Sequence, residues 1–382
     1  MRILVLGAGL QGAACAFDLL NTSDAVVTLA DARMTALPGF LADAPRDRLA
    51  HIQLDARDEF SMAAAMSAHD VALSALPYYF NYDALRSAIE AGTHFADLGG
   101  NTEIVDRQLS LADRAREEGV GAVVDCGLAP GMVNVLAMDL VQRMDQVESV
   151  KLYVGGLPQH PEPPLNYQIV YSLEGTLDYY TTKAWILQDG EPKRVEALSG
   201  VEEIDFPEPI GQLEAFHTGG GLSTMPWDLA GKIKSMEYKT LRYPGHVAYM
   251  KPIRALGLLS LQPVDAKGVS VVPRDLFVAL ADTALRKPDG RDLVVLLVQA
   301  TGQKGGQSIT ASYRLIDRYD ETNSVSAMMR TTGYSLSITG QMLAHGKIKT
   351  GVHTAYQVTP ADQFIEELAH RGINAERTTS NV

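Results

Sequence analysis

Cysteine is scarce in this 382-residue chain, where only Cys15 and Cys126 occur. Two dispersed cysteines are too few for a disulfide scaffold or a zinc cluster, so we predict no metal site and interpret Cys15 as a small core residue. Runs of lysine and arginine are absent as well, and the formal net charge is −13. A chain this acidic repels polyanions, which argues against nucleic acid as a partner.

The sequence also lacks a long apolar run. No stretch reaches the length that spans a bilayer, and the N-terminus has the pattern of a β-strand rather than that of a signal peptide. We therefore expect a cytoplasmic protein without a membrane partner. The residues that are present, 46% hydrophobic and 21% charged, are typical of a globular protein, and the length favours two domains.

The clearest motif lies at the N-terminus, where an apolar strand runs into Gly7, Gly9 and Gly12. A helix is expected over residues 13–20, and a second strand ends at Asp31. This order is typical of a dinucleotide site. Gly7 permits the tight turn, Gly9 lets backbone amides approach the pyrophosphate, and Gly12 lets the helix pack closely with its N-terminal dipole facing the phosphates.

Asp31 bears on the choice of cofactor. A carboxylate that accepts hydrogen bonds from ribose hydroxyls would repel a 2′-phosphate at the same place, so NAD is favoured over NADP. Arg33 is the counter-argument, because its guanidinium could hold a phosphate if Asp31 turned away.

Short apolar strands then alternate with alanine-rich helices as far as residue 125, which indicates a doubly wound parallel sheet. The expected strands cover residues 25–31, 51–55, 70–76, 94–98 and 120–125, and the expected helices cover residues 62–68, 82–91 and 109–118. From about residue 147, β-type runs at 148–155, 168–172, 237–243 and 293–300 replace this alternation, and residues 206–225 have the composition of loops over a site.

Helical periodicity returns at residues 326–343 and 360–371, with a short segment at 348–351 between them. One interpretation is a simple helical tail, and the other is a return of the chain to the nucleotide domain. We predict the second: an α/β Rossmann domain (1–133), an inserted α+β substrate and oligomerisation domain (134–320), and a C-terminal helical part (321–382) that completes the Rossmann domain. Apolar strands in the inserted domain favour a homodimer or higher homo-oligomer.

Ligands of such sheets bind at the carboxyl ends of the strands. Asp125 ends a strand there, and the loop after it holds Gly127 and Pro130, a combination suited to binding a carboxamide through main-chain hydrogen bonds. The candidate cofactor-binding residues are Gly7, Gly9, Leu10, Gln11, Gly12, Asp31, Asp55, Ala75, Leu76, Pro77, Asp125, Gly127, Leu128, Ala129 and Pro130.

Several motifs together resemble the saccharopine dehydrogenase family, and within it the lysine 6-dehydrogenase group. The similarity runs from residue 1 to about residue 300 and rests on G-A-G-L-Q-G at 7–12, D-L-G-G at 97–100, D-C-G-L-A-P-G-M at 125–132, Y-V-G-G-L-P at 153–158, Y-S-L-E-G at 171–175, E-A-F-H-T-G-G-G at 214–221 and Y-K-T-L-R-Y-P-G-H at 238–246. The resemblance implies NAD-dependent oxidative deamination of the side-chain amine of L-lysine, giving ammonia and 2-aminoadipate 6-semialdehyde, which cyclises to a piperideine carboxylate.

This chemistry needs a cationic clamp for the substrate carboxylate, a carboxylate for its α-ammonium group, and a base. We expect Arg242 to be the clamp because a guanidinium matches a carboxylate bidentately. Thr240, Tyr243, Thr218 and Tyr78 are further candidates for substrate binding, and the catalytic candidates are Asp97, His217 and Glu174. Each catalytic candidate also has an ordinary structural interpretation, such as a cap at a turn or at a helix N-terminus.

Two rival functions remain open at this stage. A related enzyme could join an amine reductively to an aldehyde, as saccharopine or carboxynorspermidine synthesis does, with a larger pocket and NADP. A protein of another class could bind the nucleotide without turnover. Turnover of lysine with NAD alone distinguishes the condensing enzyme from the preferred function, since condensation needs a second substrate.

Overall fold

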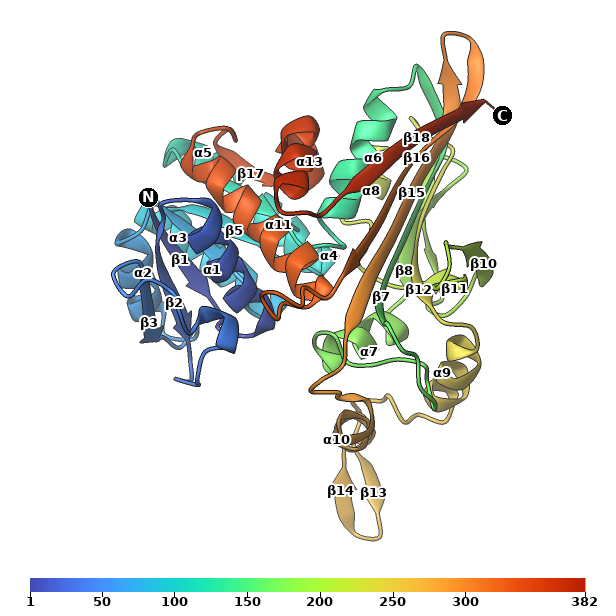
Figure 1. The fold of residues 1–382 in the computed structure, drawn as a ribbon, viewed down its shortest axis with the longest axis horizontal. Coiled ribbons are helices and arrows are strands. Elements are labelled where there is room, and N and C mark those ends of the chain that lie inside the picture. The colour runs from blue at the N-terminus through green and yellow to red at the C-terminus, as the bar shows by residue number, and fades with distance from the viewer. Residues whose placement is uncertain (382) are drawn as a thin grey trace.

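The computed structural model describes residues 1–381 as two sheets surrounded by helices (Figure 1). The first sheet has seven strands, all parallel, in the order β17-β6-β5-β4-β1-β2-β3. Its strands are β1 (Arg2–Leu6), β2 (Val26–Asp31), β3 (Leu49–Gln53), β4 (Val71–Ser74), β5 (His94–Asp97), β6 (Gly121–Val124) and β17 (Gly351–Thr354). Strands β1 to β6 follow the Rossmann order, so the predicted fold class is confirmed.

The connections of this sheet are helical. They are α1 (Leu10–Thr22), η1 (Gly39–Leu41), α2 (Glu59–Ser67), η2 (Tyr78–Phe80), α3 (Asn81–Ala91), α4 (Thr102–Leu109), α5 (Ala112–Glu117) and α6 (Met132–Gln142). The single helix predicted over residues 109–118 is wrong in extent, because two helices follow β5. Asn101 begins the first by accepting a hydrogen bond from the Ile104 backbone amide, a helix-cap signal that an apolar periodicity does not include.

The second sheet has nine strands and is mixed. Its main path is β10-β11-β12-β7-β15-β16-β18, and β8 pairs with both β12 and β9. The strands are β7 (Gln146–Pro158), β8 (Ala184–Gln188), β9 (Glu191–Val195), β10 (Glu202–Asp205), β11 (Gln212–His217), β12 (Ser235–Arg242), β15 (Asp292–Lys304), β16 (Gln307–Arg318) and β18 (Ala375–Asn381). The strand predicted at residues 168–172 is wrong, since this segment is the irregular lead into α7 (Leu173–Thr181).

We refer to residues 246–286 as the arm. Its hairpin and second helix project from the rest of the molecule in Figure 1, and its first helix packs against the end of the mixed sheet. The arm consists of α9 (His246–Ala255), the hairpin of β13 (Val264–Ala266) and β14 (Val269–Val271), and α10 (Pro273–Leu285). The remaining short helix is α8 (Met225–Asp228), which follows the glycine-rich loop after β11.

The C-terminal part of the chain joins both sheets. Helix α11 (Ala327–Ala344) packs beside α1, where a Cβ on Gly333 would lie 2.7 Å from the Gln11 carbonyl oxygen, and β17 adds to the edge of the parallel sheet next to β6. The short helices α12 (Ala355–Val358) and α13 (Ala361–His370) follow. The expectation of a purely helical return is wrong in one respect: the last strand, β18, pairs with β16 in the mixed sheet.

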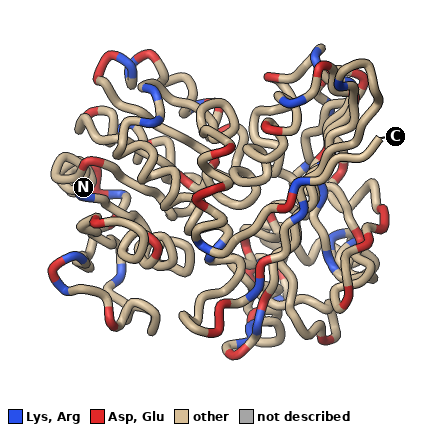
Figure 2. Tube along the Cα trace, turned by 45° about the horizontal axis from the view of Figure 1, so that its top comes forward, with Lys and Arg blue, Asp and Glu red and all other residues tan. Residues whose placement is uncertain are grey.

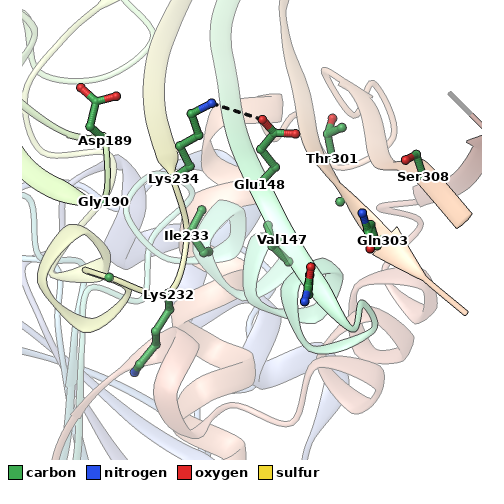
Figure 3. Close-up of a pocket in the computed structure, with 13 residues that line it drawn as sticks. Val147, Glu148, Asp189, Gly190, Lys232, Ile233, Lys234, Thr301, Gln303 and Ser308 are labelled. Atoms are coloured by element: carbon green, nitrogen blue, oxygen red, sulfur yellow. Dashed lines mark hydrogen bonds and ion pairs between the residues drawn. The ribbon is translucent and has the colours of Figure 1, made fainter. Parts of the chain in front are cut away.

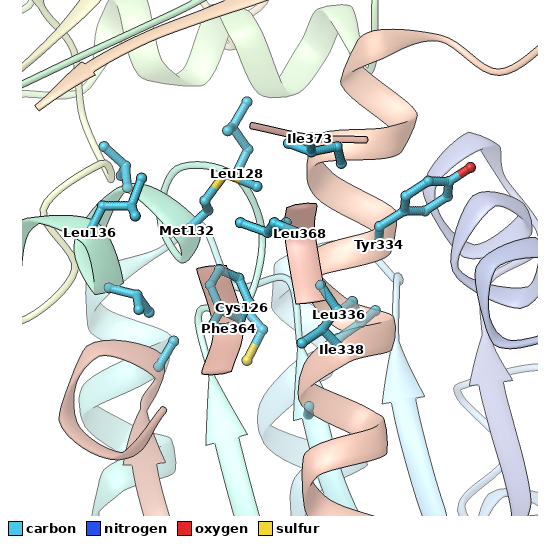
Figure 4. Close-up of a cluster of buried hydrophobic side chains, with 14 of the residues drawn as sticks. Cys126, Leu128, Met132, Leu136, Tyr334, Leu336, Ile338, Phe364, Leu368 and Ile373 are labelled. Atoms are coloured by element: carbon cyan, nitrogen blue, oxygen red, sulfur yellow. The ribbon is translucent and has the colours of Figure 1, made fainter. Parts of the chain in front are cut away.

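Buried contacts hold this return in place. Figure 4 shows apolar side chains from the loop after β6 and from α6, among them Leu128 and Met132, packed against residues of α11 and α13 such as Leu336 and Leu368. Arg371 also donates to Asp18 on α1 at 2.8 Å, an ion pair that is almost fully buried on both sides. Removing one partner of such a pair leaves an uncompensated buried charge, so the N- and C-terminal parts depend on each other.

Charged residues of both signs are mixed along the trace in Figure 2. No helix within residues 1–381 is long and apolar enough to cross a membrane.

Candidate functional site

A cavity of about 190 Å³ lies between the two sheets. One wall is formed by the loops after β5 and β6, the other by the face of β7 and β12 and by α7 and α11. Its lining residues are Gln11, Leu98, Gly99, Gly127, Leu128, Ala129, Pro130, Val154, Gly156, Tyr171, Tyr179, Thr218, Gly219, Tyr238, Thr240, Arg242, Met328 and Thr332. The cavity therefore lies at the carboxyl ends of the parallel strands, where doubly wound sheets bind ligands.

The glycine turn borders this cavity and has the geometry of a phosphate-binding loop. Gly7 adopts φ +94° with Ala75 of the β4 end packed against it, and a Cβ on Gly12 would lie 1.8 Å from the Gly7 carbonyl oxygen. Nothing lies within 4 Å of the place where a Cβ on Gly9 would be, which leaves open space in front of the α1 N-terminus. Helix N-termini with free approach of this kind bind pyrophosphate.

Gln11 provides an independent sign of a polar ligand. Both its amide nitrogen and its amide oxygen are buried, and neither has a hydrogen-bond partner within residues 1–381. Buried polar atoms are normally paired, because an unpaired one costs about 1–3 kcal/mol. Since Gln11 also lines the cavity beside the glycine turn, the residues present fit a bound dinucleotide.

Two acidic candidates for cofactor binding, Asp31 and Asp55, differ in their surroundings. The Asp31 carboxylate accepts hydrogen bonds from the backbone amides of Ala8, at 2.9 Å, and Arg33, at 3.0 Å, so it is held beside the glycine turn. Asp55 lies on the surface after β3 and pairs with Arg57 at 2.6 Å, and the hydrogen bonds from Arg57 lower the pKa of Asp55 to about 2. Asp55 is thus an exposed paired carboxylate rather than a residue of the cavity.

The loop after β6 begins at a residue with positive φ and ends at a glycine that a hydrogen bond holds in place. Asp125 adopts φ +59°, and Gly131 adopts φ +132° with its backbone amide donating to Asn134 Oδ1 at 2.7 Å. The Asn134 amide nitrogen donates in turn to the Gly221 carbonyl oxygen at 3.0 Å, which ties this loop to the glycine-rich loop after β11. Sequence reasoning missed Asn134, whose partner is 87 residues away.

Two buried carboxyl groups lie beneath the loops that line the cavity. Asp97 Oδ2 accepts a hydrogen bond from Gln108 at 2.6 Å, and burial raises the pKa of Asp97 to about 6. Asp125 lies against Gly99, and Asp125 Oδ1 accepts from the Gly100 amide at 3.1 Å. Burial, assisted by the nearby Asp97 charge, raises the pKa of Asp125 to about 7.

Arg242 is the one charged side chain among the cavity-lining residues. Arg242 Nε donates to the Tyr180 hydroxyl at 3.1 Å, a terminal nitrogen donates to the Leu241 carbonyl at 2.8 Å, and the guanidinium lies over the Tyr167 ring. It forms no ion pair within residues 1–381, although only 4% of the residue is exposed. The neighbouring His246 stays neutral, because burial and the Arg242 charge lower its pKa to about 3. A buried cation without a counter-ion is suited to binding a carboxylate.

Alternation along β12 decides which predicted substrate residues face the cavity. Thr240 faces it, and its hydroxyl lies 2.7 Å from that of Thr218. His217 pairs in register with Lys239 and points to the opposite face, where His217 Nε2 lies 2.9 Å from Glu237. Tyr243 is also on that face and donates to the Pro158 carbonyl oxygen. Because successive side chains of a strand point to opposite faces, the expected roles of His217 and Tyr243 at the substrate are corrected.

Two further predicted residues lie outside the cavity. Glu174 is exposed in the first turn of α7, which matches its alternative interpretation as a helix N-terminal carboxylate. Tyr78 lines an adjoining chamber rather than the cavity itself. The catalytic candidate Asp97 does not line the cavity either. Its carboxylate lies beneath the cavity wall, where it accepts hydrogen bonds from Gln108 and from the Asp125 backbone amide.

Aromatic residues missed by the sequence analysis complete the walls. Tyr171, Tyr179 and Tyr238 line the cavity, and Met328 and Thr332 approach from α11. The two α11 residues are four apart and share one helix face, but the sequence does not show which face meets the mixed sheet.

A larger groove of about 780 Å³ lies at the other end of the mixed sheet (Figure 3). It is open, its Glu148 and Lys234 side chains pair with each other at 3.5 Å, and none of the predicted site residues lines it. The 190 Å³ cavity is therefore the better candidate site.

Comparison with protein families agrees with this organisation. Residues 3–123 match the family model of the saccharopine dehydrogenase NADP binding domain, and residues 127–373 match that of the saccharopine dehydrogenase C-terminal domain. The chain belongs to the saccharopine dehydrogenase family. Membership supports an oxidoreductase that acts on an amine or an aldehyde and a nucleotide-binding first domain.

Relatives across the saccharopine dehydrogenase family differ in the reactions their names describe. The chain is 22% identical to the NADP-dependent, L-glutamate-forming saccharopine dehydrogenase of Schizosaccharomyces pombe over 98% of both chains, and 22% identical to the carboxyaminopropylagmatine dehydrogenase of a Synechocystis species over 97% of this chain and 96% of the other. The match to the corresponding saccharopine dehydrogenase of Pyricularia oryzae, at 24% identity, covers 68% of this chain and only 58% of that protein.

Solved structures share the fold. Apo saccharopine dehydrogenase of Saccharomyces cerevisiae superposes with a TM-score of 0.79 at 21% identity over 99% of both chains. A homospermidine synthase of Legionella pneumophila in complex with NAD superposes with a TM-score of 0.70 at 11% identity over 100% of this chain and 91% of the other.

Proposed function

We propose that this protein catalyses NAD-dependent oxidative deamination of the side-chain amine of L-lysine. The observation that carries the proposal is Arg242, a buried guanidinium that has no counter-ion within residues 1–381 and lines a cavity next to the glycine turn. A carboxylate held there directs the rest of an amino acid toward the loops after β5 and β6. A side chain of several methylenes then brings its terminal amine to Leu98 and Gly99.

The walls suit the remaining parts of such a substrate. Tyrosine rings at Tyr171 and Tyr238 provide apolar surface for methylene groups and electron-rich faces for an α-ammonium group. The hydroxyls of Thr218 and Thr240 provide hydrogen-bond acceptors for the same group. No carboxylate lines the cavity within residues 1–381, so we assign the ammonium group to these neutral partners.

The reaction converts lysine in its side-chain ammonium form, the oxidised dinucleotide and water into the aldehyde, an ammonium ion, the reduced dinucleotide and one proton. A dinucleotide, when bound, supplies the hydride acceptor. We assign to Asp125 the proton that the side-chain ammonium group gives up to become a neutral amine before hydride transfer, because Asp125 lies against Gly99 of the cavity wall and its pKa of about 7 suits a base that works near neutrality. Water then adds to the substrate iminium carbon, and the C–N bond breaks as ammonia leaves.

The choice of NAD rests on Asp31. Its carboxylate is fixed by two backbone amides beside the turn, where it can accept hydrogen bonds from ribose hydroxyls and would repel a 2′-phosphate. The matching family model is named for NADP, so the two cofactors must be compared directly.

The test is an amine screen followed by NADH or NADPH absorbance. We expect turnover of L-lysine with NAD, release of one ammonia per NADH, and a product that cyclises. Absence of a signal from lysine with either cofactor would contradict the proposed activity.

Reductive condensation is the second candidate, because relatives such as the carboxynorspermidine synthase of Vibrio cholerae carry names of that kind. An enzyme of this class would oxidise NADPH only when an amine and an aldehyde are both present. Oxidation of lysine without a second organic substrate would exclude it as the main activity.

A further inference from the structure

A second chamber adjoins the candidate site. It has a volume of about 320 Å³ and is formed by the loop after β5, by α7 and by the strand ends around Trp185. Tyr179 and Gly219 are the residues that line both this chamber and the 190 Å³ cavity. The side chain of Tyr179 is therefore the partition between the two spaces.

Two glycines, Gly100 and Gly220, lie against the Tyr179 side chain. A Cβ on Gly100 would lie 2.9 Å from the Tyr179 hydroxyl oxygen, and a Cβ on Gly220 would lie 3.1 Å from the ring carbon Cε1. Gly100 and Gly220 adopt φ of +110° and +85°, a region that disfavours other residues. The ring thus fills the gap where the loop after β5 meets the loop after β11.

The backbone of this region holds the ring in place. The Gly219 amide donates to the Tyr179 carbonyl oxygen at 3.3 Å, and the next loop residues are tied to Asn134. The Tyr179 hydroxyl has no hydrogen-bond partner within residues 1–381, so its position depends on packing of the ring rather than on a polar contact.

The partition lies at the end of the cavity where the substrate amine is expected. Leu98 and Gly99, where the proposed function places the amine, line the cavity, and Gly100 follows directly and lies against the Tyr179 hydroxyl. The side chain of lysine ends in a primary amine, which reaches no farther than Gly99. A substituent on the amine nitrogen would extend into the volume that the ring occupies.

We propose that Tyr179 determines substrate specificity by closing the amine end of the cavity, so that the enzyme accepts a primary amine and excludes amines with a large nitrogen substituent. This proposal rests on the proposed function, since it assumes that Arg242 binds the substrate carboxylate and that the substrate amine lies at Gly99. Removing the ring joins the cavity to the adjoining chamber, where a nitrogen substituent then has room.

The experiment compares lysine with two N6-substituted lysines, N6-propyl-lysine and saccharopine, by NADH formation in wild type, Tyr179→Ala and Tyr179→Phe. Oxidation of a substituted lysine at C6 followed by addition of water gives the same aldehyde, NADH and the substituent as a primary amine. In Tyr179→Ala we expect the ratio of kcat/KM for the substituted lysines to that for lysine to rise at least about tenfold, because the steric exclusion is removed. Tyr179→Phe keeps the ring and should keep the wild-type ratio.

An unchanged ratio in Tyr179→Ala would overturn the proposal, as would a large rise in Tyr179→Phe. If Tyr179→Ala does not fold, Tyr179→Leu replaces it, since the shorter side chain also opens the partition. A wild type that oxidises neither lysine nor a substituted lysine overturns the proposed function and, with it, the partition. A wild type that oxidises lysine and both substituted lysines with similar kcat/KM overturns the partition alone.

Discussion

At the scale of single residues, burial decides the chemistry of the site. Arg242 has no counter-ion within residues 1–381, and the buried carboxyl groups of Asp97 and Asp125 have raised pKa values because burial disfavours their charged forms. Burying ionisable groups in this way costs stability, and perturbed pKa values of this kind are typical of functional sites. The sequence indicated Arg242 as a clamp, but only the burial and the missing counter-ion distinguish it from a surface arginine.

Replacing Arg242 by Ala should raise the KM for lysine by about a hundredfold and change kcat much less, because a charge-assisted hydrogen bond to the substrate carboxylate is lost. Steady-state kinetics at saturating NAD measures this. Arg254→Ala is the matched control, since Arg254 donates to the backbone carbonyls of Tyr180 and Ala197. A similar rise in KM for that control would point to a general loss of structure.

Asp125 should control the pH dependence of kcat. A base must be unprotonated, so we expect kcat at saturating lysine to fall below about pH 7. Asp125→Asn should reduce kcat by at least about a hundredfold. Because the Asp97 charge contributes to the raised pKa of Asp125, Asp97→Asn should move the inflection to lower pH. A profile that stays in place in Asp97→Asn would remove Asp125 as the base.

Asp125 should also make stability depend on pH: a rise in pH that increases kcat should decrease the stability of the fold. The pKa of Asp125 is higher in the folded state than in the unfolded state, so its stabilising contribution is present at acid pH and is lost as the pH rises toward about 7. Asp125→Asn, which cannot ionise, should therefore raise the unfolding temperature more at pH 8 than at pH 5. Thermal unfolding at both values checks this, and an equal shift at both would contradict it.

At the scale of elements, strand ends and the loops after them build the site. The glycine turn after β1 meets the β4 end, and the loops after β5 and β6 form one wall of the cavity. These loops were predictable, because parallel strands place their carboxyl ends at one edge. The face of β12 that lines the cavity was not predictable. Side chains alternate between the two faces of a strand, and the sequence does not show which face meets the other sheet.

The end of β2 should determine cofactor preference. Asp31→Ser removes the carboxylate beside the glycine turn and leaves Arg33 nearby, so we expect the ratio of kcat/KM for NADP to that for NAD to rise about tenfold or more. Asp55→Ser is the control, because Asp55 pairs with Arg57 on the surface. A ratio that Asp31→Ser leaves unchanged would show that Asp31 does not select the cofactor.

At the scale of the whole molecule, the arm carries many of the exposed large apolar side chains. Leu256 is 77% exposed, Leu280 66% and Val269 61%. A two-stranded hairpin such as β13–β14 is marginally stable alone in water, and exposed apolar side chains that gather in one patch mark interaction sites. The homo-oligomer expected from the sequence stays a prediction, and the arm is where we expect copies of the chain to meet.

Sedimentation analysis should therefore show a homo-oligomer, and Leu256→Glu combined with Leu280→Glu should shift it toward the monomer, because buried charges without partners oppose association. Phe60→Glu is the matched control, since Phe60 is 85% exposed on α2 and lies outside the arm. A monomeric wild type, or dissociation by Phe60→Glu alone, would contradict this role of the arm.

The sequence by itself determined the alternation of strands and helices in the first domain and the glycine turn, because these depend on local periodicity and on the spacing of glycines. Periodicity also showed the C-terminal helices, but their return to the parallel sheet was one of two interpretations that it allowed. Tertiary structure alone decided that β18 joins the mixed sheet, that His217 faces away from the cavity and that Tyr179 lies between two chambers. The physical reason is that these features depend on strand pairing and burial between residues far apart in the chain, and no local pattern encodes which surfaces will meet.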